Sequence, residues 1–334
     1  MFLARIRHEG PDGIEPRIVA TSNPDGPWVD VRTAERRRLE RTGATSWAAR
    51  RISRAIVPGS MTAALESGTA FMDATRAAIE SRDGEHVQID TLLTTPLDPC
   101  LYRDFMVFEE HFSFGYRWRG LEVPAVLYEF PVSYIGAIHG FIGPGEEVPW
   151  PHYTDHMDYE LELGIVIGRG GRDLRPEEAE EHILGLTILN DFSARDIQAR
   201  EMAAGLGPSK GKHFASGLGP WIATLEEIPA SGLRMRSRIN GEAWCDSSSS
   251  EMIWSIPEIV AWASAGEWLA PGTLLGSGTA NGGSGIERGK KLNPGDVVEL
   301  EIERLGVLRN PIGRPRSGWL PTPRKRRSPT DSIT

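Results

Sequence analysis

Two glutamates separated by one residue, Glu160 and Glu162, are the first candidates for chemistry in this chain. The apolar run Leu163-Gly-Ile-Val-Ile follows them and is typical of a β-strand. Because successive side chains on a strand point to opposite faces, both glutamates point to the same face, about 7 Å apart along the backbone. A second apolar run ends at Asn190 and leads to Asp191, a third carboxylate. Three carboxylates with no Cys or His among them favour Mg²⁺, Mn²⁺ or Ca²⁺ over zinc or copper.

Each of these acids, taken alone, also fits a solvated strand face, which is the more common setting of a Glu-x-Glu pair. A further segment carries a histidine. The spacing of Phe105, Phe108 and Phe112 predicts a helix, on which Asp104 and His111 lie two turns apart on one face. Without further context, the ordinary interpretation of these two residues is a helix-capping aspartate and an incidental surface histidine.

Four spaced motifs together resemble the fumarylacetoacetate hydrolase (fumarylacetoacetase) superfamily. They are Glu160-x-Glu162, Asn190-Asp-Phe-Ser-Ala-Arg-Asp-Ile-Gln198, Gly207-Pro-Ser-Lys-Gly-Lys-His-Phe-Ala-Ser216 and Ser277-Gly-Thr279. The resemblance covers roughly residues 99–313. It implies an α+β fold, mainly β, in which a catalytic domain of mixed rolled sheets over residues 96–314 follows a small N-terminal domain over residues 1–95. Residues 315–334 are basic and rich in proline, which predicts a disordered tail.

The resemblance also implies a role for each site residue. The metal ligands would be Asp104, Glu160, Glu162 and Asp191. His111 would be the general base, oriented by Glu287, and Lys212 would face the substrate oxyanion. The residues that would hold the substrate are Arg119, Tyr134, Gln198 and Thr279. Small differences in spacing leave Arg117 as an alternative to Arg119, and Lys210 as an alternative to Lys212.

The reaction that these roles imply is hydrolysis of a carbon–carbon bond in a 1,3-diketo acid, with a divalent metal (Mg, Ca or Mn) as cofactor. Shorter relatives act on 2-oxo acids as decarboxylases, hydratases or isomerases, and they carry Asn-Tyr-x-x-His-x-x-Glu in their first helix. Here Phe108 stands in place of that histidine and His111 in place of that glutamate, which favours the hydrolase. Met106 stands where the type enzyme has a tyrosine, so fumarylacetoacetate itself is a doubtful substrate. A binding protein without catalytic activity is the third alternative.

Composition excludes several other classes of protein. The chain has 334 residues and a net charge of −9, which argues against a nucleic-acid partner because phosphate binding requires a basic surface. No apolar stretch approaches the 18 residues of a membrane span. The two cysteines, Cys100 and Cys245, are too few for a disulfide framework and suggest reduced thiols in a cytoplasmic protein. The resemblance further implies a homodimer.

The remaining elements follow from local patterns. Residues 2–7 and 17–20 are expected to form a hairpin around the turn signal of residues 10–13, and the segment that begins at Asp30 a third strand. Residues 60–81 are expected to be helical, and Pro176 to begin a helix. Residues 235–241 are expected to form a strand ending in an Asn-Gly turn, residues 256–264 a helix, and residues 295–303 a half-buried strand with solvated acids.

Overall fold

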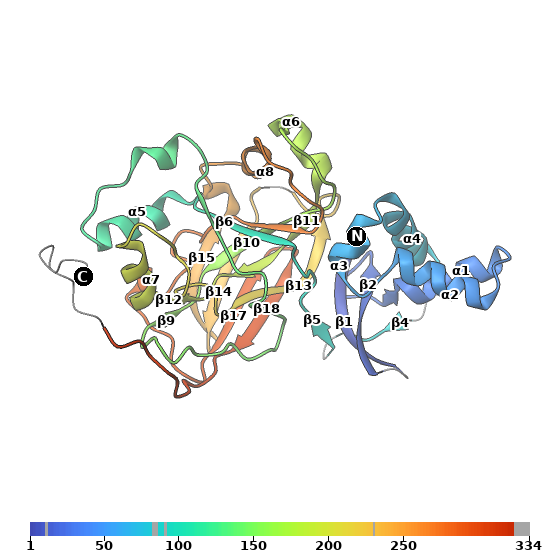
Figure 1. Cartoon of the computed structure of the whole chain (residues 1–334), viewed down its shortest axis with the longest axis horizontal. Coiled ribbons are helices and arrows are strands. Elements are labelled where there is room, and N and C mark those ends of the chain that lie inside the picture. The colour runs from blue at the N-terminus through green and yellow to red at the C-terminus, as the bar shows by residue number, and fades with distance from the viewer. Residues whose placement is uncertain (11–12, 82–85, 90–91, 230, 324–334) are drawn as a thin grey trace, which may run out of the picture.

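The protein is described from a computed structural model that covers residues 1–10, 13–81, 86–89, 92–229 and 231–323. Figure 1 shows the N-terminal strands and helices, in blue, at one end of the long axis, and the larger remainder of the chain at the other. Among the described residues, no helix combines the length and apolar character that crossing a bilayer requires. The fold is mixed α and β, as the resemblance implies.

The strands are β1 (Phe2–Gly10), β2 (Gly13–Thr21), β3 (Trp28–Asp30), β4 (His86–Val87), β5 (Leu93–Thr94), β6 (Leu101–Phe105), β7 (Ser133–Ile135), β8 (Phe141–Ile142), β9 (Met157–Asp158), β10 (Leu161–Ile167), β11 (Ile183–Asn190), β12 (Ser193–Ala194), β13 (Ser216–Thr224), β14 (Arg234–Ile239), β15 (Glu242–Ser248), β16 (Thr273–Gly276), β17 (Val297–Ile302) and β18 (Gly306–Pro311). The helices are α1 (Val31–Arg41), α2 (Ser46–Ile56), α3 (Met61–Glu66), α4 (Thr69–Glu80), α5 (Glu109–Trp118), α6 (Pro176–Ala179), α7 (Arg195–Met202) and α8 (Ile256–Ser264), with short 3-10 turns η1 (Ala125–Tyr128), η2 (Glu180–His182), η3 (Ser249–Glu251) and η4 (Ile286–Arg288).

One large sheet runs through both parts of the molecule. Among the described residues its strand order is β4-β3-β2-β1-β13-β11-β10-β16-β6-β7, with β5 paired to β1 and β8 to β13. Strands β10 and β11 lie in its middle, and every residue in them is buried. Near-continuous apolar strands of this kind are expected where both faces of a sheet are covered. The centre of the sheet therefore forms a rigid support for the residues at the strand ends.

The N-terminal part contains the expected hairpin, since β1 and β2 pair in antiparallel register from Phe2 opposite Thr21 onward. The tip of the expected turn, residues 11–12, lies outside the described residues. The prediction of a strand beginning at Asp30 was wrong, because β3 ends there and helix α1 begins at the next residue. The Asp30 carboxylate accepts a hydrogen bond of 2.7 Å from the Thr33 amide, which is the interaction of a helix N-cap. The expected helical segment 60–81 is present as α3 and α4.

The helix predicted around Asp104 was also wrong at its start. Residues Leu101–Phe105 form β6, which pairs in parallel with β16, and helix α5 begins only at Glu109. Asp104 and His111 therefore do not share a helix face. Phe105 and Phe108, whose spacing suggested a helix, are instead buried at the end of a strand and in the turn that follows it.

A second sheet, in the order β15-β14-β17-β18 among the described residues, contacts the first where β18 meets β13 and β17 meets β11. The predicted Asn-Gly turn joins β14 to β15, with Asn240 and Gly241 at φ 52° and 82°, the left-handed conformation that this hairpin turn requires. Strand β17 alternates buried and half-buried residues, as predicted. The predicted helices at Pro176 and at Ile256 are present. Residues 315–323 of the expected tail are exposed and irregular, and the rest of the tail lies outside the described residues.

Candidate active site

Three carboxylates meet where the central strands of the large sheet end. Asp104 lies on β6, Glu162 on β10, and Asp191 directly after β11, and their oxygens lie within 4.8 Å of one another. All three side chains are buried. Gly276 on β16 lies opposite Asp104, and a Cβ atom there would lie 2.2 Å from Asp104 Oδ1. A residue larger than glycine would therefore displace a carboxylate of this cluster.

The electrostatics of the three carboxylates match a cation site. Burial, and then the neighbouring carboxylates, raise the pKa of Asp104 and of Glu162 well above the ordinary values. Glu162 Oε2 and Asp191 Oδ1 are buried and accept no hydrogen bond from the described residues. Buried oxygens without partners are costly, and a cation would satisfy them. Carboxylate oxygens alone form the donor set, which suits Mg²⁺, Mn²⁺ or Ca²⁺.

Glu160, the fourth predicted ligand, lies beside this cluster but contacts cationic side chains. Arg195 Nη1 lies 2.6 Å from Glu160 Oε1, and the Lys212 ammonium contacts Oε2. Burial opposes the ionisation of Glu160, yet Lys212 and Arg195 lower its pKa below the ordinary range. The structure thus brings Asp104, Glu162 and Asp191 within chelating distance of one another and pairs Glu160 with two cations. The role of Glu160 as a metal ligand stays a prediction.

Lys212 lies between the carboxylates and is buried. Its Nζ atom is 2.5 Å from Asp191 Oδ2 and also contacts Glu160. Burial lowers the pKa of Lys212, but these two carboxylates outweigh burial and raise it above the ordinary value. Lys210, the alternative, is exposed, and its ammonium lies 5.6 Å from the centre of the Tyr153 ring. Of the two lysines, only Lys212 reaches the cluster.

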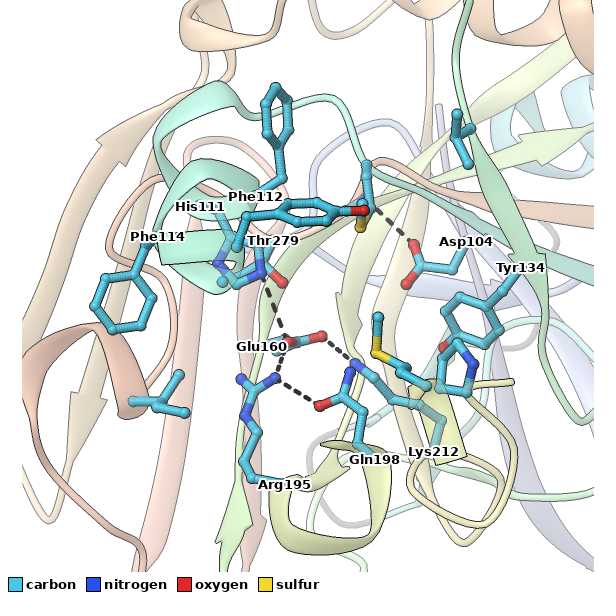
Figure 2. Close-up of a pocket in the computed structure, with 18 of the residues that line it drawn as sticks. Asp104, His111, Phe112, Phe114, Tyr134, Glu160, Arg195, Gln198, Lys212 and Thr279 are labelled. Atoms are coloured by element: carbon cyan, nitrogen blue, oxygen red, sulfur yellow. Dashed lines mark hydrogen bonds and ion pairs between the residues drawn. The ribbon is translucent and has the colours of Figure 1, made fainter. Parts of the chain in front are cut away.

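His111 is positioned by helix α5 beside the same cluster. Its Nδ1 atom lies 2.9 Å from Glu287 Oε2, and its Nε2 atom lies 3.8 Å from Glu160 Oε1. Glu287 is fixed in turn by the Gly282 amide at 3.0 Å and the Ser284 hydroxyl at 2.7 Å. Burial opposes the ionisation of Glu287, but His111 and these hydrogen bonds lower its pKa. Figure 2 shows His111 next to Glu160, with its Nε2 side toward the pocket.

The predicted substrate-binding residues line the same cavity, but two of them now bond to carboxylates of the site. The Tyr134 hydroxyl donates to Asp191 Oδ2 at 2.6 Å, and the Thr279 hydroxyl donates to Glu162 Oε1 at 3.2 Å. Gln198 accepts a hydrogen bond of 3.1 Å from Arg195 Nη1. Arg119 lines the cavity. The alternative to it, Arg117, is exposed and is not among the described residues that line the cavity.

Two positioning groups were not identified from the sequence as parts of the site. Asp158 is fully buried and accepts hydrogen bonds from Arg195 Nε at 2.9 Å and from the Gly285 amide at 2.8 Å. Glu201 accepts hydrogen bonds from three successive backbone amides, at positions 209, 210 and 211, just before Lys212. The alternation of Asp158 with Glu160 and Glu162 could have signalled the first. No local pattern signals the second.

The cavity that these residues surround has a volume of about 270 Å³. Asp104, Glu162 and Lys212 line it on one side, and helix α5 contributes His111 and several aromatic side chains. A small organic acid in this cavity would contact a cation site, a base paired with a carboxylate, and a lysine. That combination can polarise a carbonyl group, activate water or abstract a proton, and stabilise a developing negative charge.

Comparison with known proteins places the chain among relatives of several activities. The oxaloacetate tautomerase YisK of Bacillus subtilis is 36% identical over 194 residues, which are 58% of this chain and 62% of that protein. The 2,4-didehydro-3-deoxy-L-rhamnonate hydrolase of a Sphingomonas species is 32% identical over 188 residues, 54% of this chain and 65% of that protein. The matched segments thus span less than two thirds of either relative.

Solved structures support the fold over nearly the whole chain. A fumarylacetoacetate hydrolase from Exiguobacterium antarcticum has a TM-score of 0.71 at 23% identity, and the match covers 94% of this chain and 99% of that chain. A 5-carboxymethyl-2-hydroxymuconate delta-isomerase from Mycobacterium smegmatis has a TM-score of 0.62 at 25% identity, covering 94% and 100%. The family described as fumarylacetoacetate (FAA) hydrolase, C-terminal, matches residues 102–313. With a matching family model over most of its length, the chain belongs to the fumarylacetoacetate hydrolase superfamily.

Proposed function

We propose that this protein is a divalent-metal-dependent hydrolase that cleaves a carbon–carbon bond of a 1,3-diketo acid. The observation that supports this most directly is the His111–Glu287 pair, in which Nδ1 lies 2.9 Å from Glu287 and Nε2 lies 3.8 Å from Glu160, the carboxylate beside the cluster. An imidazole held by a carboxylate on Nδ1 can take a proton from water on Nε2.

Each residue has a separate role in the proposed reaction. Asp104, Glu162 and Asp191 would hold the cation, which when bound polarises the substrate oxygens and supplies a counter-charge for an enolate. His111 takes a proton from water, and the water oxygen bonds to the acyl carbon of the substrate. The bond between that carbon and the central carbon then breaks, and its electron pair leaves with the enolate.

His111 also supplies the proton that completes the 2-oxo acid product. The imidazolium of His111 returns its proton to the central carbon of the enolate, so that the diketo acid and one water give a carboxylic acid and a 2-oxo acid. Lys212 donates hydrogen bonds toward the oxyanion that forms when water adds. Loss of one preorganised donor of this kind commonly costs about 3–4 kcal/mol of barrier.

A product assay tests the proposal. The purified protein is incubated with Mg²⁺ or Mn²⁺ and 2,4-dioxopentanoate, and the products are followed by proton NMR in D₂O. Hydrolysis predicts acetate and pyruvate in equal amounts, lost in the His111→Ala and Glu287→Gln variants. Release of carbon dioxide, or a hydrated product with the carbon chain intact, would overturn the proposal.

Tautomerisation of a 2-oxo acid is the second candidate, favoured by the name of the 36% identical relative. It needs the same base and the same cation site, but no water, because His111 would move a proton between carbon and oxygen of the substrate. With oxaloacetate in place of 2,4-dioxopentanoate, a tautomerase accelerates conversion between the enol and keto forms, with no cleaved acids.

A further inference from the structure

Asp158 is a fully buried carboxylate whose oxygens contact two segments that lie far apart in the sequence. On one side, Arg195 Nε donates to Oδ2 at 2.9 Å, and Arg195 Nη2 lies 2.8 Å from the same oxygen. On the other side, the Gly285 amide donates to Oδ1 at 2.8 Å, and the Ile286 amide donates to Oδ2 at 3.1 Å. Arg195 begins helix α7 and Ile286 begins turn η4. One carboxylate thus joins α7 to η4.

Backbone pairing explains why these two segments meet at Asp158. In the short sheet of β9 and β12, Asp158 lies opposite Ser193, just before helix α7. Glu160 forms an isolated antiparallel bridge with Ser284. Since antiparallel partners move in opposite directions along their strands, this bridge brings Asp158 near residue 286. The backbone therefore fixes the carboxylate between the two segments.

The two segments carry different parts of the candidate site. Turn η4 carries Glu287, whose Oε2 atom lies 2.9 Å from His111 Nδ1. Helix α7 carries Arg195, whose Nη1 atom lies 2.6 Å from Glu160 Oε1. Figure 2 shows Glu160 between His111 and Arg195, with a dashed line to each. The position of the base relative to Glu160 therefore depends on how η4 and α7 are held together.

We propose that Asp158 is a positioning residue that holds the His111–Glu287 pair in place relative to Glu160, by joining turn η4 to Arg195. The inference rests on the proposed function only in taking His111 as the base, a role that the tautomerase alternative shares. Both carboxylate oxygens are needed, because each accepts from at least one donor of the chain. An amide in this place would present an NH₂ group to other donors, so at least one segment would lose its contact.

Kinetics of Asp158→Asn test this role in the full chain loaded with Mg²⁺, with 2,4-dioxopentanoate as substrate. We expect kcat to fall about 100-fold, because misplacing a reacting group by about 1 Å can cost that much. KM should stay within about twofold, since a base acts in the transition state. Affinity for Mn²⁺ should also be kept, because Asp158 does not belong to the carboxylate cluster. Wild-type kcat in folded Asp158→Asn would overturn the inference.

Gly285→Ala disturbs the same contact from the other side and serves if Asp158→Asn fails to fold. Gly285 has φ −64° and ψ −38°, which alanine adopts without strain, but a Cβ there would lie 2.5 Å from Asp158 Oδ1. We expect a fall in kcat of about tenfold from this smaller displacement. The double variant should be no slower than Asp158→Asn, because both changes break one contact. Fully additive losses would overturn the coupling.

The imidazole of His111 gives a measurement that does not depend on turnover. With Glu287 beside Nδ1, wild-type His111 should carry its proton on Nδ1 and leave Nε2 free. Proton–nitrogen spectra of histidine-labelled, Mg²⁺-loaded protein at pH 8 report this tautomer, and His111→Ala assigns the signal. Asp158→Asn or Gly285→Ala should give a mixture of both tautomers. An unchanged tautomer in both variants would contradict the inference.

Asp98→Asn is the matched control, because Asp98 also joins an arginine to the backbone. Its Oδ1 atom lies 3.2 Å from Arg5 Nη1 and accepts a hydrogen bond of 2.8 Å from the Met61 amide. Asp98→Asn should lower the melting temperature and leave both kcat and the His111 tautomer unchanged. A fall in kcat equal to that of Asp158→Asn would mean that general loosening of the fold slows the reaction, and would overturn the inference.

These measurements also separate the inference from the proposed function. If no diketo acid is cleaved but the His111 tautomer changes in Asp158→Asn or Gly285→Ala, the hydrolase fails and the positioning role stands. If acetate and pyruvate form at the wild-type rate in both variants, the hydrolase stands and the positioning role fails.

Discussion

Glutamates occur at alternate positions in two segments of this protein, and the two pairs lie in different environments. In the segment leading into β10, Glu160 and Glu162 are buried within the molecule. On β17, Glu299 and Glu301 are part of a half-buried sheet face. The first pair lies beside two further acids in a closed site, and the second lies on a sheet surface.

The partners of the two pairs explain the difference. Glu301 lies 3.0 Å from Arg236 and 2.8 Å from Arg238, both on the neighbouring strand β14. Its charge is balanced across the sheet, as expected for opposite charges on neighbouring strands. Glu162 faces two other carboxylates, and one of its oxygens has no hydrogen-bond partner among the described residues. One sequence pattern thus gives a sheet face whose charges are paired in one place, and a buried acidic cluster that could hold a metal ion in the other.

Neutralising one acid of each strand gives the sharpest test of this comparison. Glu162→Gln should abolish metal binding and lower kcat/KM on the order of 10⁴-fold, since Lewis-acid stabilisation is worth several kcal/mol. Glu301→Gln should leave both unchanged. Calorimetric titration with Mn²⁺ and the product assay measure the two effects. Wild-type metal affinity in Glu162→Gln would remove the distinction between the strands.

Removing the base should leave the cation site intact. His111→Ala is expected to lower kcat by about 10²- to 10⁴-fold, the usual contribution of a general base. Metal affinity should stay within about twofold, because the His111 ring does not belong to the carboxylate cluster. Near-wild-type turnover in this variant would exclude His111 as the base.

The metal-free protein should respond to pH through the buried acids. The pKa of Glu162 is raised above its ordinary 4.5, so the folded chain keeps protons that the unfolded chain releases. Glu162 and the other buried acids therefore destabilise the metal-free fold increasingly as pH rises above about 4.5. Mn²⁺, which binds ionised carboxylates, should bind more tightly as pH rises, by up to about tenfold per pH unit. Thermal melts and Mn²⁺ titrations between pH 5 and 8 measure both trends. In metal-free protein at pH 8, Glu162→Gln should melt higher than wild type, and a lower melting temperature would contradict this account.

The loop that carries Lys212 offers a smaller test. Partial burial opposes the ionisation of Glu201, but hydrogen bonds from the backbone amides of residues 211, 209 and 210 lower its pKa. Because hydrogen bonds to a charged group are worth about 1.5–3 kcal/mol, Glu201→Gln should loosen this loop and lower kcat about tenfold. The stability contributed by Glu201 is present above its unfolded pKa and is lost as pH falls through the lowered folded pKa. A kcat equal to wild type would show that the loop is held by other contacts.

The smallest effect is expected on β17. Glu301→Gln should change the free energy of unfolding by about 0–1 kcal/mol, because its ion pairs are partly solvated and screened by salt. Chemical denaturation at low and at high salt measures this contribution, which should shrink as salt is added. A loss of several kcal/mol would show that this face is also dependent on its charges.

The family and the general fold could be predicted from the sequence, because the motifs that carry the resemblance are short, continuous stretches of residues. It did not allow the setting of Asp104 to be predicted. That residue lies on a strand that pairs with β16, about 170 positions further along, and aromatic spacing within ten residues carries no information about such a partner. Local spacing therefore suggested a helix where long-range pairing makes a strand.

No local pattern in the sequence distinguishes Glu160, which pairs with cationic side chains, from Glu162, which lies in the carboxylate cluster. Glu160 and Glu162 are two residues apart, but Glu160 forms ion pairs with Arg195 and Lys212, which lie in later segments of the chain. Asp30 shows the same limit on a smaller scale. Its side chain ends a strand and caps a helix, and the pattern of residues around it fits either element.

The pairing of β1 with β13 has a consequence for the molecule as a whole. Phe2 lies opposite Ala223 and Leu3 opposite Ile222, so the N-terminal hairpin extends the same sheet that supports the carboxylates. Residues 96–314 expressed alone would leave that stretch of β13 as a bare edge, open to strand addition by another molecule. Truncation should yield aggregates, and heat should melt both parts of the intact protein in a single transition.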